Sequence, residues 1–323
     1  MEQHKTNNPH DSLARRFLCD PERMAELLLL YLMNLDDQQM IDLLDLTRLV
    51  CSDPVTVSDR LVEGRGDLQF TTTFKGSDRE AGVYLFFEHQ STKDTNFRLR
   101  GLNFIIQKYN KFWETTKGQE KFPYPIVLVL YHGTTPWTHV PVMDELIETV
   151  PGMKTGLLDY TLILIDISLL TQDKFVGHPV LQVVLEMLQL ASKGELAAHL
   201  DRVMARLRSV SDDPRIYNWL ASFAQYVLST TTLEREQVAK TFSQAVNKEE
   251  VYNMVMTTAE KLFTDGETKA GRTLVIRAIQ EKFKTVPEDI ARAINQKSDP
   301  IVLESLLAQV IGSNTLEEFA EGL

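Results

Sequence analysis

The chain has 323 residues, of which 43% are hydrophobic and 24% charged, an ordinary globular composition but too long for one typical compact core. With 34 Lys and Arg against 45 Asp and Glu, the net charge of −11 counts against a general nucleic-acid-binding protein, although it leaves room for a local basic surface. The apolar runs are too short to span a bilayer, so we expect a cytoplasmic protein without a membrane segment or signal peptide. Cys19 and Cys51 lie far apart in the sequence, which fits a reducing compartment and gives no metal-binding spacing.

Two helices are expected near the start of the chain. Asp11 or Ser12 can cap the first of them. Asp20 precedes a proline and a nearly all-apolar run, so we expect the second helix to lie at the centre of the core. The next stretch is ambiguous, and its best interpretation is a short helix over residues 38–49 and an irregular first strand over residues 55–62.

Residues 66–91 predict an antiparallel hairpin. Its first arm is rich in Phe and Thr, its second arm begins Val-Tyr-Leu-Phe-Phe, and the segment between them has Gly at both ends. Pairing the arms about that turn brings Asp67 near Glu88 and Gln90 at one end of a sheet. Because side chains of a strand alternate between its faces, Glu88 and Gln90 share a face.

Two carboxylates and an amide at one place have the ligand chemistry of a metal site. Oxygen ligands with positions left for water suit Mg²⁺ or Mn²⁺. The alternative is a solvated sheet edge, because an acid before one strand and a Glu-x-Gln at the end of another often occur by chance. The apolar run before Glu88 favours the site, because polar groups that close a buried strand need partners.

Residues 96–116 predict a long helix after the hairpin, with large apolar residues at helical spacing. Residues 93–121 contain seven Lys or Arg and three acids. Asn96, Arg98 and Arg100 stand at the start of this helix, where a helix N-terminus and arginines suit phosphate. A DNA contact and a solvated helix face both remain open for them.

Two continuous apolar runs predict strands that are buried on both faces, over residues 125–131 and 160–167. Residues 141–148 between them fit a short helix. Asp166 ends the second strand, where a structural hydrogen bond is favoured over a metal. His10 is expected to be a surface residue or one adjacent to the cap of the first helix, in preference to a ligand.

From residue 177 onward the pattern is helical. The expected helices cover residues 179–192, 195–209, 214–228, 232–246, 251–263, 266–283, 287–295, 300–310 and 315–323. The sequence suggests two domain boundaries. The first is a shift in composition near residues 172–178, and the second lies at residues 264–266. The predicted domains are residues 1–175, a helical region of residues 176–264 and a small helical module of residues 265–323.

The order of these elements resembles the PD-(D/E)xK nuclease core, whose sheet carries an acid on one strand and (D/E)-x-K at the end of the next. More closely, the chain is similar to the Rpn family of recombination-promoting nucleases and transposase-like proteins. The similarity rests on PHDSLARRFLCDPERMAELL, GDLQF, YLFFEHQST with FRLRGLNFIIQKY, IVLVLYHG and the C-terminal segment beginning RTLVIRAIQEKF. It implies an α/β fold, a restriction-endonuclease-like core with a central mixed β-sheet flanked by helices, followed by an all-helical C-terminal region.

The resemblance also implies an activity, namely a Mg²⁺-dependent DNA endonuclease tied to recombination or to a transposase-like mobile element. Asp67 and Glu88 would then bind the metal. Gln90 stands where the wider superfamily carries Lys, and an amide can orient water or phosphate but supplies no positive charge. Asp11 is the first candidate for the acid of the N-terminal helix and Glu26 the second, with helix capping as the alternative for Asp11.

Two other functions stay open on the sequence alone. The missing Lys and the acidic net charge also fit a catalytically silent interaction protein that keeps the nuclease fold, and the same chemistry also fits an antiphage or toxin-like nuclease. Cutting both DNA strands suits a symmetric pair of sites, so we expect a homodimer, formed through the C-terminal helical region.

Overall fold

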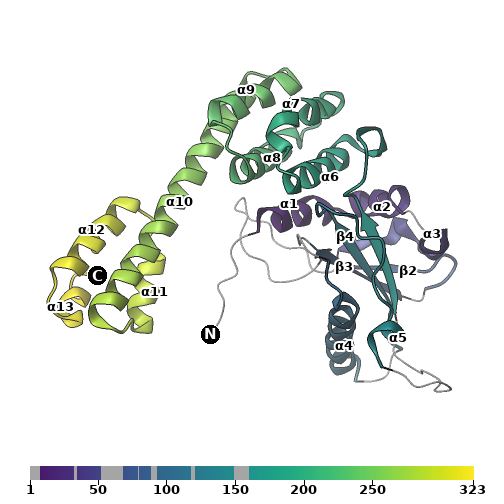
Figure 1. The fold of residues 1–323 in the computed structure, drawn as a ribbon, viewed down its shortest axis with the longest axis horizontal. Coiled ribbons are helices and arrows are strands. Elements are labelled where there is room, and N and C mark those ends of the chain that lie inside the picture. The colour runs from purple at the N-terminus through teal and green to yellow at the C-terminus, as the bar shows by residue number, and fades with distance from the viewer. Residues whose placement is uncertain are drawn as a thin grey trace.

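The structure, a computed structural model, describes residues 8–32, 35–51, 68–78, 80–88, 93–117, 121–148 and 160–323. These residues form an α/β unit built on a five-stranded sheet, and a long run of helices follows it (Figure 1). The predicted α/β class with a mixed sheet and a helical C-terminal part is confirmed.

The sheet has the strand order β1-β2-β3-β4-β5. Its first two pairings are antiparallel and its last two are parallel, so the sheet is mixed. The strands are β1 (Val50–Cys51), β2 (Leu68–Thr73), β3 (Glu80–Glu88), β4 (Tyr124–Tyr131) and β5 (Thr161–Asp166). The strand predicted over residues 55–62 lies outside the described residues.

The hairpin predicted from the sequence is formed by β2 and β3. Leu68 pairs with Leu85 at one end, and Thr73 pairs with Glu80 at the other. The turn is shorter than predicted, because β3 begins at Glu80. Gly76 in this turn has a φ of +70°, which glycine adopts at little cost. Buried and half-buried residues alternate along β2, as expected for a strand with one face on the core.

The first two helices are α1 (Pro9–Leu18) and α2 (Pro21–Leu30). Asn8 caps α1, so capping by Asp11 or Ser12 was wrong; the Asn8 side chain accepts a hydrogen bond from the His10 backbone N–H. Asp20 caps α2 as predicted. α2 packs in the main core through Met24, Leu27 and Leu28, as expected, but its other side is open, because Leu29 and Leu30 are exposed. A short helix, α3 (Leu35–Asp42), and a single 3₁₀ turn, η1 (Leu46–Arg48), follow.

The two faces of the sheet are covered by different helices. Alternate residues of β4 contribute to two hydrophobic clusters, one of which contains Leu128 and the other Val129. The Leu128 cluster contains the apolar faces of α1, α2 and α6 (Pro179–Ser192). The Val129 cluster is much smaller and is covered by α4 (Phe97–Thr116), which Figure 1 shows on the other side of the sheet from α1, α2 and α6.

Helical elements make up the rest of the chain. They are α5 (Met143–Leu146), η2 (Gln172–Lys174), α7 (Leu196–Ala205), η3 (Arg206–Val210), α8 (Ile216–Thr230), α9 (Arg235–Val246), α10 (Glu250–Phe283), α11 (Glu288–Gln296), α12 (Pro300–Gly312) and α13 (Leu316–Ala320). The two helices predicted over residues 251–263 and 266–283 are one helix, α10. None of the helices in the described part of the chain is both long and apolar enough to cross a membrane.

The hydrophobic core does not follow the predicted boundary near residues 172–178. One cluster runs from Leu13 through the sheet to Val255 in α10, so the sheet and α6 to α9 share a core. A second cluster, from Val275 to Phe319, holds α11 to α13 against the end of α10. The domain bounds themselves stay a prediction.

Candidate active site

The predicted site depends on strand ends that lie together at one edge of the sheet. β3, β4 and β5 run parallel, so they end at the same edge, and the antiparallel β2 begins there. Glu88, Tyr131 and Asp166 are register partners in a row across β3, β4 and β5. The hairpin therefore has the pairing that the sequence predicted, with the start of β2 and the end of β3 on one side.

The predicted metal ligands are only partly described. Asp67 and Gln90 lie outside the described residues. Glu88 is placed as the last residue of β3, but its side chain is not described. The metal site and its ligands therefore stay a prediction that rests on the strand pairing. No cluster of three or more His, Cys, Asp or Glu suited to a metal occurs among the described residues.

Asp166 has the structural role that the sequence favoured. One carboxylate oxygen accepts a hydrogen bond from the Trp137 backbone N–H at 2.7 Å, and the other accepts one from the Ser168 backbone N–H at 2.8 Å. The carboxylate thus fixes the loop after β4 and the turn after β5. Both carboxylate oxygens of Asp166 therefore stabilise the chain at this end of the sheet.

A polar cluster at the end of β4 joins this edge to distant helices. His132 is buried, and its Nδ1 lies 2.8 Å from the Ser192 hydroxyl oxygen in α6. His10 of α1 lies 2.6 Å from the Tyr226 hydroxyl oxygen in α8, and its ring centroid is 5.6 Å from that of His132. Burial raises the pKa of Tyr226 above its ordinary value, so this hydroxyl stays neutral.

His10 therefore lies beside the Asn8 cap, as the sequence suggested, and its half-buried side chain also contacts Tyr226. No local pattern indicates its partner, because His10 and Tyr226 are 216 positions apart. Asp11 follows His10 in the first turn of α1, where a carboxylate is favoured by the helix dipole. Its side chain also lies 3.8 Å from the Arg15 guanidinium. The catalytic role of Asp11 stays a prediction, as does that of Glu26.

The three residues at the start of α4 have different roles. Arg98 is only 6% exposed, and its guanidinium donates to the carbonyl oxygens of Pro141 and Tyr160, each at 3.0 Å. A guanidinium used in this way pins α4 to the neighbouring loops and is not available to a phosphate. Arg100 lies 2.6 Å from the Asp94 carboxylate and is half exposed, and Asn96 is exposed at the N-terminus of α4. The DNA contact stays a prediction for Asn96 and Arg100.

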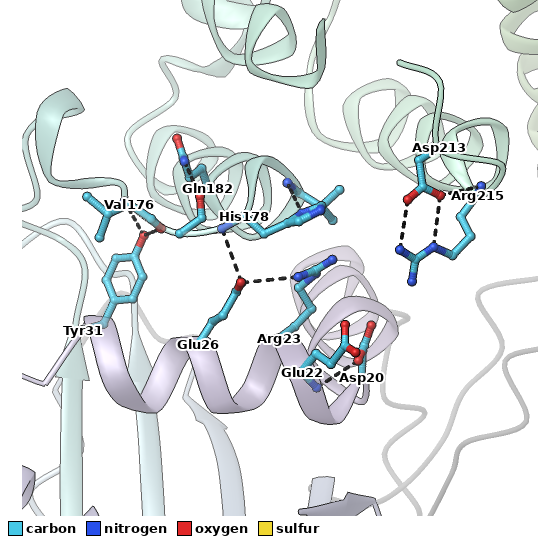
Figure 2. Close-up of polar contacts among 12 residues, drawn as sticks. Asp20, Glu22, Arg23, Glu26, Tyr31, Val176, His178, Gln182, Asp213 and Arg215 are labelled. Carbon is cyan, nitrogen blue, oxygen red and sulfur yellow. Dashed lines mark hydrogen bonds and ion pairs between the residues drawn. The ribbon is translucent and has the colours of Figure 1, made fainter. Parts of the chain in front are cut away.

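A second polar network joins α2 to the start of α6 (Figure 2). The Tyr31 hydroxyl oxygen donates to the Val176 carbonyl at 2.7 Å and accepts from its N–H at 2.8 Å. The Glu26 carboxylate lies 3.4 Å from both the Arg23 guanidinium and the His178 backbone nitrogen. These contacts tie the loop after β5 to α2, which gives Glu26 a structural role in the described structure.

His178 caps α6 with its ring. Its Nδ1 accepts a hydrogen bond from the Val180 backbone N–H at 3.2 Å. Burial lowers the pKa of His178, and Arg23 lowers it further. Nearby, the Arg215 side chain donates two hydrogen bonds to Asp213 and lowers the pKa of that carboxyl to about 2. His178 stabilises the start of α6 and Asp213 stabilises the start of α8, so these contacts have a structural role.

Comparison with known proteins gives the family. The model of the family described as "Putative transposase, YhgA-like" matches residues 8–216. The recombination-promoting nuclease RpnD of Escherichia coli O157:H7 is 24% identical over 272 residues, which cover 82% of this chain and 98% of that protein. The inactive recombination-promoting nuclease-like protein RpnE of Escherichia coli strain K12 is 24% identical over 273 residues, which cover 82% of this chain and 85% of that protein. No solved structure matches the chain.

The matched residues include α1, the hairpin, α4, the two parallel strands and the helices as far as the start of α8. They therefore include every residue of the predicted site. The similarity that the sequence indicated is confirmed, and the chain belongs to the YhgA-like transposase family, with recombination-promoting nucleases among its relatives.

Proposed function

We propose that this protein is a metal-dependent DNA endonuclease with a restriction-endonuclease-like core, acting in the cytoplasm in recombination or for a mobile element. The observation that carries the proposal is the pairing of β2 with β3, which puts the start of one strand and the end of the other at a single sheet edge. Asp67 immediately precedes β2, and Glu88 ends β3. The family and the names of its relatives support a nuclease or transposase-like function for this edge.

The donor set fits a hard divalent cation. Asp67 and Glu88 would hold Mg²⁺ or Mn²⁺, because both cations prefer carboxylate and water oxygens. A cation bound there supplies an activated water and stabilises the charge that develops on the phosphate. Gln90 would orient the water or the phosphate by hydrogen bonds, since an amide carries no charge.

The start of α4 would position the DNA backbone. The N–H groups at a helix N-terminus attract phosphate, and Arg100 adds a cation in the first turn. Arg98 serves the same purpose indirectly, because its bonds to the Pro141 and Tyr160 carbonyls fix the angle of α4. The Tyr160 hydroxyl also donates to the Arg98 carbonyl at 3.0 Å, and Gly101 leaves room for it, since a Cβ at that position would overlap the hydroxyl.

Nicking of a supercoiled plasmid in Mg²⁺ or Mn²⁺ tests the proposal. Wild type should cut, and Asp67→Ala and Glu88→Gln should each lower the rate by at least about 100-fold, the loss expected when metal-assisted catalysis fails. The matched control is Asp265→Asn, an exposed acid of α10 that should cut like wild type. Equal cutting by wild type and Asp67→Ala would place the activity elsewhere and reject the assigned site.

The second candidate function is a catalytically silent protein that retains the nuclease fold for binding. Gln90 in place of Lys favours it, and one relative is named as inactive. No cutting by wild type across metals and salt concentrations, together with retained binding to DNA, would support this function over the first. Cutting that harms the host cell or an infecting phage would instead support an antiphage or toxin-like role.

We also propose that the active form is a homodimer, because two sites related by symmetry can cut both strands. The sequence assigned the contact between the two copies to the C-terminal helical region. The surface of the described residues offers a second place for it, on α4.

A further inference from the structure

Large apolar side chains form an exposed row along α4. Leu99 is 56% exposed, Ile106 43% and Trp113 54%. Seven residues separate each from the next, which places all three on one side of the helix. Leu102 and Tyr109 fall between them and are half-buried, so the row has the spacing of a helix–helix contact. A helix face of this kind commonly packs against another helix.

The C-terminal module has no such row on its longest apolar helix. Ile301, Val302 and Ile311 of α12 are 75%, 39% and 69% exposed. Ile301 and Ile311 are ten residues apart, so they lie at opposite ends of α12 and are rotated by roughly 80° around its axis. The adjacent Ile301 and Val302 at one end and Ile311 at the other give a partner helix no continuous surface. The geometry therefore favours α4 over α12 as the main contact.

We propose that the α4 row binds a second copy of this chain, with the two α4 helices antiparallel about a twofold axis at Ile106. Leu99 and Trp113 each lie seven residues from Ile106, in opposite directions. An antiparallel pair centred there places Ile106 against itself and Leu99 against Trp113 of the second copy. The contact is then self-complementary, as a twofold interface requires.

The kind and size of the surface also favour a second copy over nucleic acid. Leu99 and Ile106 offer neither hydrogen bonds nor a flat ring for stacking on bases, and the ring of Trp113 is already stacked on Phe122, with centroids 6.1 Å apart. A helix of 20 residues is about 30 Å long. Two such helices packed along that length bury on the order of 1,000 Å² in total, the low end of the range for specific interfaces.

This arrangement concerns assembly, and it does not depend on the chemistry proposed for the sheet edge. It does set the distance between the two edges. The start of α4 lies beside its own edge, because Phe97 packs edge-on against Trp137, whose backbone N–H bonds to Asp166. Antiparallel α4 helices would put the two edges on the order of 30 Å apart, about one turn of duplex DNA.

The molecular mass of the protein in solution tests whether the α4 row binds a second copy. Wild type should sediment as a dimer at micromolar concentration, and Ile106→Asp should halve the mass while keeping the circular dichroism of wild type. The matched control, Ile301→Asp, changes an equally apolar exposed residue of α12 and should remain a dimer. A monomeric wild type, or a dimer lost in Ile301→Asp and kept in Ile106→Asp, would overturn the proposal. Lost DNA binding with unchanged mass in Ile106→Asp would assign the row to nucleic acid.

Cysteine cross-linking tests the direction. Ile106→Cys should give a covalent dimer under mild oxidation, because the residue faces its own copy. Leu99→Cys and Trp113→Cys should cross-link when mixed and not separately, whereas a parallel pair would link each of them to itself. Wild type, whose Cys19 and Cys51 are half-buried, is the control. Failure of Ile106→Cys to cross-link in a dimeric protein would reject the proposed axis.

Discussion

Two of the three hydrophobic clusters among the described residues differ greatly in size, and α10 joins them. The first core extends from Leu13 to Val255 and contains both the sheet and the helices that follow it. The second core, from Val275 to Phe319, consists of the end of α10 packed with α11 to α13. Between them α10 is largely exposed, and Phe263 there is 68% exposed.

This difference indicates how the molecule folds. We expect the α/β part and α6 to α9 to unfold together, because their apolar residues contribute to one core. The small module has its own core, but a module of this size buries little surface and is only marginally stable. We therefore expect two unfolding events, a main one for residues up to about Val255 and a weaker one for the C-terminal helices.

The largest effect is expected from Phe223→Ala. Phe223 is fully buried in α8 and stacks on Phe17 of α1, with ring centroids 4.6 Å apart. Removing this ring should lower the free energy of unfolding of the main core by about 3–5 kcal/mol. Urea denaturation followed by circular dichroism measures it, with the exposed Asn218→Ala of the same helix as control. Loss of only the helical signal, with the sheet intact, would contradict the single core.

Ile294→Ala should have a smaller and more local effect. Ile294 is fully buried in the second core, and its truncation should cost the module about 2–5 kcal/mol. Amide hydrogen exchange should then show faster exchange in α11 to α13 and unchanged exchange in the sheet. The control is the neighbouring exposed Asn295→Ala. Faster exchange throughout the chain would show that the two cores unfold together.

The regular parts of this fold could be predicted because local signals decide them. α6 begins at Pro179 and ends at Ser192 as predicted, and β4 follows its continuous apolar run. α10 could not be predicted as one helix, since Gly266 looked like a break. A single glycine costs a helix only about 1 kcal/mol. Thr268 beside it donates to the Ser298 carbonyl at 3.1 Å, which helps hold the helix through this region.

In the candidate site, too, local structure could be predicted from the sequence, whereas long-range contacts could not. The pairing of β2 with β3 followed from the turn and the strand pattern, because a hairpin is a local structure. For Arg98 the sequence left a DNA contact and a solvated helix face open, and only the packing of α4 on the loops shows that its guanidinium binds two carbonyls. The contact of His10 with Tyr226 has no local signal, because it depends on how α1 and α8 meet in the shared core.

His178→Ala should have a moderate effect at the joint between α2 and α6. Loss of the hydrogen bond to the Val180 N–H should cost about 1 kcal/mol at neutral pH, as for other helix caps. Since burial lowers the pKa of His178, the unfolded chain binds a proton more readily than the folded one. The contribution of this residue is therefore complete above its ordinary pKa of 6.5 and falls as the pH drops below that value.

Unfolding free energies measured between pH 8 and pH 5 test this expectation. The difference between wild type and His178→Ala should shrink as the pH falls, whereas Asn218→Ala, which removes no titratable group from the exposed side of α8, should show no such trend. Asp213 titrates in a separate window, below its ordinary pKa of 3.8 toward about 2, and leaves this range undisturbed. A difference that grows toward pH 5 would show that the charged form of His178 is the one stabilised by folding.

The smallest expected effect is in the exposed part of α10 and has the opposite sign. Gly266 lies in the helix interior, and an added Cβ would meet nothing within 4 Å. Gly266→Ala should therefore stabilise α10 by about 0.5–1 kcal/mol, because alanine loses less backbone entropy in a helix. Gly271→Ala is the matched control in the same helix. Its new Cβ would lie 3.0 Å from the Leu303 Cβ, so packing strain should cancel the gain. If both variants stabilise the C-terminal module equally in thermal unfolding, α12 does not pack on α10 as closely as the structure shows; if neither does, the helix is not continuous through Gly266 in solution.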